Sequence, residues 1–274
     1  MRRQQLLVPV RNYRLPKQCG SLRNQVVYPG PIRMRTPLPV ILLVMATELV
    51  AAGPLEEAKT ALDKGDFRSA ERTYSELSSQ GDRTAQLQLG LMYDEGHGVP
   101  KQHHQAVRWY SVAASQGDAE APFYLGRIYH DGRGGPKNYV RARQWYRVAA
   151  DRGNQKAAVN LGTMHSLGLG VPKNYQVAGQ WFLLAANFGD IKAQKNLGEM
   201  YENGVGVRRD YPTAYMWFAI AAATQGDSEA AKHRDKIARL MTPDQIERAR
   251  KLSSEKVYTL IRCHGGSTLS CPGR

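Results

Sequence analysis

The sequence is poor in the residues that form disulfide, metal and thiol sites. Only three of its 274 residues are cysteines, Cys19, Cys263 and Cys271. No C-x-x-C motif occurs, and no pair of Cys or His residues has the spacing of a zinc site. We therefore expect no metal and no cofactor. Cys263 and Cys271 could close a small disulfide loop in an oxidising compartment or remain free thiols, and their spacing leaves both possibilities open.

Motifs that mark enzymes are missing as well. The segment Ser253-Ser-Glu-Lys256 has S-x-x-K spacing, but the S-D-N and K-T-G motifs that accompany it in serine enzymes do not occur. The segment from Gly96 to Gly98 follows no strand pattern and is not followed by G-K-[ST], so it does not predict a phosphate loop. We predict no catalytic residues.

Acidic residues are missing from the beginning of the chain. The formal net charge is +14, yet the first 35 residues hold eight basic and no acidic side chains, which leaves 30 basic against 24 acidic residues in the remainder, a net charge of +6. These charges alternate in sign, and no stripe of Lys and Arg is interleaved with aromatic residues. The composition therefore argues against nucleic acid as a partner.

No apolar run is long enough to cross a bilayer as a helix. The longest one covers 38–46 and is interrupted by Glu48. It follows Met34 and one Arg, and small residues end it at 50–52, which is the pattern of a signal peptide. We predict a cleaved signal peptide at 34–52, no integral membrane insertion, and a periplasmic or secreted protein.

Two features of this region have alternative interpretations. Residues 1–33 are basic and rich in proline, and are either a disordered extension or a mis-assigned upstream extension with Met34 as the true initiator. Residues 38–52 could instead form a buried first helix, in which case the protein would be cytosolic. The mature N-terminus distinguishes these interpretations.

What the sequence does contain is a repeat of 36 residues. Four families of residues recur at this step: Trp109, Trp145, Trp181 and Trp217; Gly90, Gly126, Gly162 and Gly198; Gly81, Gly117, Gly153 and Gly189; Ala106, Ala142, Ala178 and Ala214. The shared unit, A-x-x-x-L-G-x-M-Y-x-x-G-x-G-V-P-K-N-Y-x-x-A-x-x-W-Y-x-x-A-A-x-x-G-D, resembles the Sel1-like repeat family, a relative of tetratricopeptide repeats. Four copies cover residues 81–227.

Each unit carries two apolar stripes at helical spacing, separated by a glycine-rich break. The first stripe includes Ala85, Leu89 and Met92, and the second includes Trp109 and Tyr110. We expect the large aromatic residues of the second helix to pack on the small residues of the first. Because one hairpin cannot bury both faces, we predict an all-α fold, a superhelical solenoid of tandem Sel1-like helical hairpins.

Partial units flank the array. Residues 53–80 contain a degenerate half-unit and predict an N-terminal capping hairpin. Residues 228–252 predict two C-terminal capping helices, the second of which begins with a Thr242-Pro-Asp-Gln245 capping box. The segment 253–274 has no pattern, and we expect it to be an irregular tail.

The resemblance also indicates where a partner would bind. In tetratricopeptide repeats an Asn just before the L-G pair hydrogen-bonds a bound peptide backbone, and Asn160 and Asn196 match that position. Gln88 and Tyr124 occupy it in the other two units. Lys195 would add a positive charge for an acidic or C-terminal carboxylate group. The alternative is that these are ordinary polar residues at the edge of the packing stripe.

Proteins of the Sel1-like family commonly serve as scaffolds or regulators, so the resemblance implies a non-catalytic scaffold or regulator of the cell envelope. Its partner would be another protein, such as an envelope protein or a sensor ectodomain, held by a monomer in the concave groove of the solenoid. A secreted virulence factor that meets a host protein is a second interpretation. A periplasmic enzyme that acts on or binds cell-wall or penicillin-like substrates is a third, although the cysteine pair per repeat of penicillin-linked relatives is missing.

Overall fold

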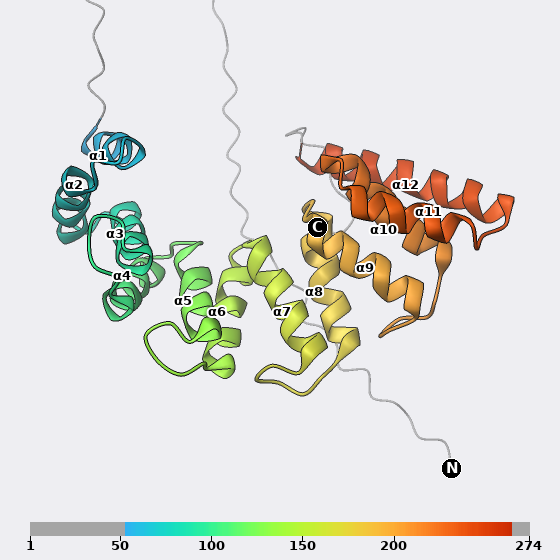
Figure 1. The fold of residues 1–274 in the computed structure, drawn as a ribbon, viewed down its shortest axis with the longest axis horizontal. Coiled ribbons are helices and arrows are strands. Elements are labelled where there is room, and N and C mark those ends of the chain that lie inside the picture. Colours follow the sequence, from blue (N-terminus) through green and yellow to red (C-terminus); the bar gives the residue numbers. More distant parts are fainter. Residues whose placement is uncertain (1–52, 265–274) are drawn as a thin grey trace, which may run out of the picture. The chain divides into compact units, whose positions relative to one another are not determined.

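The computed structural model describes residues 53–264, so the predicted extension at 1–33, the predicted signal peptide at 34–52 and Cys271 lie outside the described residues. The described part consists of helices joined by short loops, without a strand (Figure 1). The helices are α1 (Pro54–Asp63), α2 (Phe67–Ser79), α3 (Arg83–Glu95), α4 (His103–Ser115), α5 (Ala121–Asp131), α6 (Tyr139–Asp151), α7 (Gln155–Leu167), α8 (Tyr175–Asn187), α9 (Ile191–Asn203), α10 (Tyr211–Gln225), α11 (Ser228–Ala238) and α12 (Pro243–His264). The prediction of an all-α solenoid of helical hairpins is confirmed.

Each repeat is one hairpin, whose first helix ends at a glycine. Gly96 closes α3 in the left-handed region at φ 78°, and its N–H donates to the carbonyl of Met92. Two residues later Gly98 is again left-handed, and a Cβ atom there would lie 2.2 Å from the Cβ of Phe67. The first glycine therefore ends the helix, and the second lets the loop rest on the start of the preceding second helix.

The close approach within each hairpin is between a glycine and the residue after the tryptophan. A Cβ added to Gly162 would lie 2.5 Å from the ring of Phe182, and one added to Gly126 would lie 2.5 Å from the ring of Tyr146. Tyr110 and Phe218 occupy the same place against Gly90 and Gly198. The expected contact of small with large residues is confirmed for these rings.

The tryptophans are not the residues nearest to these glycines. Trp109 is partly buried and packs on a cluster that includes Tyr74 of the preceding hairpin and Leu89 and Met92 of its own first helix, α3. Trp145 packs in the same way on the cluster around Tyr110. Trp109 and Trp145 therefore pack on clusters that their own hairpin shares with the one before it.

Both ends of the array carry additional helices. Helix α1 packs on α2 and α2 packs on α3 at one end, while α12 packs on α10 at the other. The predicted capping box is confirmed: Thr242 N–H donates to Gln245 Oε1 at 2.9 Å, and Gln245 N–H donates to Thr242 Oγ1 at 3.3 Å.

The expectation of an irregular tail from Ser253 onward was wrong for its first part, because α12 continues to His264. The hydroxyls of Ser253 and Ser254 donate to the carbonyls of Ala249 and Arg250 within the helix. Leu252 and Val257 pack against the large core cluster of the last repeats. This packing stabilises a helix that the local sequence alone does not predict. None of the described helices has the length and apolar content needed to cross a membrane.

Candidate functional site

The five residues predicted to bind a partner all lie on first helices. Gln88 lies on α3, Tyr124 on α5, Asn160 on α7, and Lys195 and Asn196 on α9, and each side chain is half-buried. The residue just before each L-G pair therefore lies on the first helix of its hairpin in each of the four repeats. Binding itself stays a prediction.

At three of these positions the side chain lies near an aromatic ring from the second helix of the preceding repeat. Tyr124 stacks on Tyr110 with ring centroids 5.3 Å apart. The side chain of Asn160 lies beside the phenol of Tyr146. Asn196 lines a cavity together with Phe182, which has no hydroxyl group to offer.

The phenol groups of Tyr110 and Tyr146 are shielded from water. Burial raises the pKa of Tyr110 and of Tyr146 far above the ordinary value for tyrosine. The Tyr110 hydroxyl is buried and has no hydrogen-bond partner among the described residues. The Tyr146 hydroxyl lies beside the side chain of Asn160. In the described part of the chain the Asn196 amide has no such partner.

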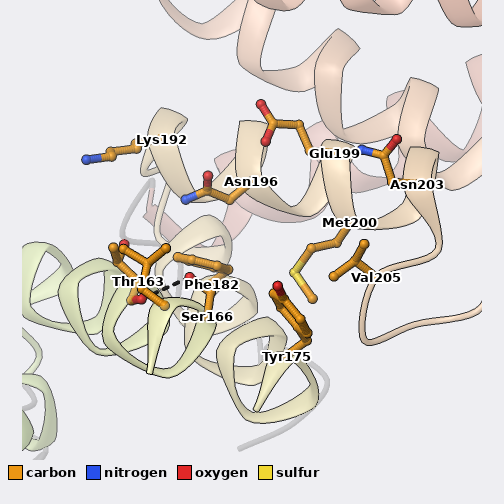
Figure 2. A pocket seen from close by; sticks show the side chains of 11 residues that line it. Thr163, Ser166, Tyr175, Phe182, Lys192, Asn196, Glu199, Met200, Asn203 and Val205 are labelled. Atoms are coloured by element: carbon orange, nitrogen blue, oxygen red, sulfur yellow. Dashed lines mark hydrogen bonds between the residues drawn. The ribbon is translucent and has the colours of Figure 1, made fainter. Parts of the chain in front are cut away.

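A cavity of about 410 Å³ opens between α7 and α9, with α8 beneath it. Figure 2 shows Lys192, Asn196, Glu199 and Asn203 along α9, with Phe182 and Met200 below them and Thr163 and Ser166 on α7. Tyr175, Leu167 and Val205 complete its apolar part. The cavity therefore combines an apolar floor with polar and charged side chains along one rim.

Lys195 takes part in a different interaction from the predicted one. Its ammonium group lies 3.3 Å from the carboxylate of Asp227 and also contacts Glu229, both at the start of α11. The hydrogen bond that Lys195 donates to Glu229 is the main reason why the pKa of Lys195 is raised. Lys192, one turn earlier on α9, lines the cavity instead. The sequence did not separate these two lysines, because only the packing of α11 shows which of them is covered.

A second cavity of about 240 Å³ lies between α5 and the start of α7. Glu120, Phe123 and Tyr124 line it from α5, and Lys156 lines it from α7. Tyr124 is thus the second predicted residue that borders a cavity, after Asn196.

The serine-lysine pair of α12 does not have the geometry of a nucleophile with its base. The hydroxyl of Ser253 donates to the carbonyl of Ala249 at 2.8 Å. The ammonium group of Lys256 lies over the ring of Trp217, 5.5 Å from its centroid, and burial lowers its pKa. The described residues contain no group of three or more His, Cys, Asp or Glu side chains that could hold a metal ion.

The buried polar residues that link successive repeats could not be recognised from the sequence pattern of a single repeat. Gln86 and Gln194, which are 108 residues apart, are almost fully buried and donate to the carbonyls of Ser78 and Ala186 in the preceding helix. The carboxylate of Asp94 is buried and accepts from Arg133 of the next repeat. The spacing of three repeat lengths between the two glutamines was the one signal that could have found them.

The chain is similar to known proteins in both sequence and structure. The family model for the Sel1 repeat matches residues 84–118, 119–154, 155–190 and 191–223. A protective antigen of uropathogenic Escherichia coli with an SLR fold is similar in structure, with 32% identity and a TM-score of 0.66 over 79% of this chain. The chain spans 48% of the length of that antigen.

A Sel1 repeat protein from Oxalobacter formigenes is similar along nearly its whole length. The two share 30% identity and a TM-score of 0.62, over 78% of this chain and 91% of the other. No curated protein matches the chain in sequence.

Proposed function

We propose that this chain, which belongs to the Sel1 repeat family, holds a partner protein or peptide in the groove formed by its first helices. Members of that family are generally non-catalytic scaffolds that bind other proteins. The partner is an envelope protein or a sensor ectodomain, and the protein acts as a monomeric scaffold or regulator of the cell envelope. No cofactor takes part.

One observation carries this proposal. Asn196 presents a side-chain amide without a hydrogen-bond partner in the described part of the chain, at the rim of a cavity of about 410 Å³ whose floor is apolar. A half-buried amide of this kind can bind a peptide backbone, because it offers both a donor and an acceptor. An apolar floor with a few polar groups is typical of a binding site.

The location in the envelope rests on the sequence of residues 34–52. A positive residue, an apolar run of nine residues and a small-residue end are the three parts of a secretory signal. On this proposal the array works in the periplasm or outside the cell.

Site-specific photocrosslinking in native cells tests the proposal. A photoreactive amino acid replaces Lys192 at the rim of the cavity, and Glu247 on the exposed side of α12 in a matched control. We expect the first variant to capture one envelope protein that the control does not capture, and we expect Asn160→Ala/Asn196→Ala to abolish the capture. Capture by both positions alike, or by neither, contradicts a partner in this groove.

A further inference from the structure

Helix α9 carries two pairs of opposite charges with the same spacing. Lys195 and Glu202 are seven residues apart, and so are Lys192 and Glu199. Seven residues of an α-helix correspond to about 10.5 Å along its axis. The two pairs differ in what lies opposite them.

The first pair is fully matched by α11. Lys195 contacts the carboxylates of Asp227 and Glu229. Glu202 accepts from Lys236 at 2.9 Å and lies 3.4 Å from the ring nitrogen of His233. The structure thus shows what complements a Lys/Glu pair on this helix: an acid opposite the lysine and a base opposite the glutamate.

The second pair has no counterpart. Lys192 and Glu199 are exposed at the rim of the cavity between α7 and α9, and no ion pair to either is present in residues 53–264. Asn196 and Asn203 lie in the same stripe (Figure 2), and their amides have no hydrogen-bond partner in this part of the chain. A helix that docked here would satisfy its own backbone, whereas an extended segment leaves N–H and C=O groups that two free amides can bind.

The apolar part of the cavity includes a leucine that only the third repeat carries at its position. Leu167 is 60% exposed and Tyr175 is 37% exposed, both beside the buried Phe182 and Met200. At the position of Leu167 the other repeats carry Glu95, Asp131 and Asn203. An exposed leucine at a position that is otherwise polar indicates a surface that contacts apolar groups.

We propose that this cavity binds an extended segment of the partner protein that carries an acidic and a basic side chain on either side of an apolar pair. The acid lies opposite Lys192 and the base opposite Glu199. An extended segment in the polyproline II conformation advances about 3.1 Å per residue with three residues per turn, so an acid and a base three residues apart lie on the same face and about 9 Å from each other. The inference rests on the proposed function, since it describes the part of the partner that enters the groove.

Fluorescence anisotropy with three labelled heptapeptides and the full chain tests this inference. All three peptides contain a central Leu-Leu pair, flanked by Glu and Lys, by two Glu, or by two Lys. The protein is used as wild type, as Glu199→Lys, which makes both rim charges positive, and as Lys192→Glu, which makes both negative. Glu247→Lys on α12 is the matched control for a change of net charge.

We expect the wild type and the control to prefer the mixed peptide. Glu199→Lys should prefer the acidic peptide and Lys192→Glu the basic one, each by about three- to fivefold in Kd, as partly exposed charge pairs allow. The same order of affinity in all four proteins, or no saturable binding of any peptide at millimolar concentration, overturns the inference. If photocrosslinking at Lys192 still captures a partner in that case, the proposed function stands and only the proposed charge pattern of the bound segment is wrong.

Discussion

Arg133 donates a hydrogen bond of 2.7 Å from Nη1 to Oδ2 of Asp94, a carboxylate that is only about 2% exposed and lies 39 residues earlier in the chain. The other oxygen of Asp94 lies 3.0 Å from Nδ1 of His103. This carboxylate therefore fastens the loop after α5 to the end of α3 and the start of α4, across the boundary between two repeats.

Replacing Arg133 by Met should destabilise this boundary. The substitution leaves a buried carboxylate with His103 as its remaining partner, and we expect a loss of about 2–3 kcal/mol in the free energy of unfolding. Urea unfolding monitored by circular dichroism measures it. Asp94→Asn combined with Arg133→Met should restore part of the loss, and a loss below about 0.5 kcal/mol for the single variant would show that the ion pair is unimportant.

Gly162→Ala should disturb the contact between α7 and α8. The added Cβ would lie 2.5–2.9 Å from three ring carbons of Phe182, in a packed core that cannot yield freely. We expect a destabilisation of about 1–3 kcal/mol, measured by thermal and urea unfolding. Gly135→Ala, where nothing lies within 4 Å, is the matched control and should be neutral. Equal stability of the two variants would contradict the assigned contact.

Phe182→Tyr should weaken the binding of a partner. A hydroxyl at this position would reproduce the pair formed by Tyr146 and Asn160, so that the Asn196 amide becomes occupied inside the protein. We expect up to about a tenfold rise in the Kd of the captured partner, the equivalent of one hydrogen bond. Titration of the purified partner against both proteins provides the measurement. Phe218→Tyr in the next repeat should leave the Kd unchanged, and an effect as large as that of Phe182→Tyr would contradict the role given to Asn196.

His165 should make the protein less stable in mild acid. Burial is the main reason why its pKa is lowered below 6.5, with the positive charge of Arg143 as a second cause. A histidine with a lowered pKa stays neutral in the fold, while the unfolded chain binds the proton. Its contribution to stability is therefore fully present above pH 6.5 and is lost as the pH falls below that value.

The variant His165→Tyr carries the residue found at the equivalent positions 93, 129 and 201. It should unfold with a smaller dependence on pH between 5 and 8 than the wild type. Urea midpoints at both pH values give the comparison. Parallel pH profiles for the two proteins would show that another group is responsible.

Export predicts a processed N-terminus close to Ala52. Mass spectrometry of the protein recovered from native cells measures it. Cleavage near this residue, which directly precedes the described helices, supports a periplasmic or secreted protein. A chain that retains residues 1–52 contradicts export and favours the cytosolic alternative.

Much of the fold follows from the sequence because its repeat is nearly exact. The step of 36 residues and the glycine-rich break in each copy are sufficient to predict hairpins and their number. The partners of the tryptophans could not be predicted in this way, because a periodic pattern shows that Trp109 is apolar but not which hairpin covers it. The helical part of the tail was missed because its stability comes from Leu252 and Val257 packing on a distant core.

The candidate site was less accessible to sequence reasoning. The sequence placed Asn160 and Asn196 at equivalent positions, yet it could not show that Asn160 lies beside the phenol of Tyr146, whereas Asn196 shares its cavity with Phe182, which has no hydroxyl. It also did not distinguish Lys192 from Lys195, because that difference depends on which face of α9 is covered by α11. These distinctions arise from packing between repeats, and no single repeat contains them.

The second glycine of each loop limits how such a protein can change in length. Gly98 meets Phe67, Gly134 meets His103, Gly170 meets Tyr139 and Gly206 meets Tyr175, in each case at the start of the preceding second helix. A residue inserted into one loop would move that glycine out of contact, whereas duplication of a whole unit would reproduce every contact. Genes for such arrays can therefore grow or shrink in steps of one repeat, and each step adds or removes one groove between neighbouring first helices.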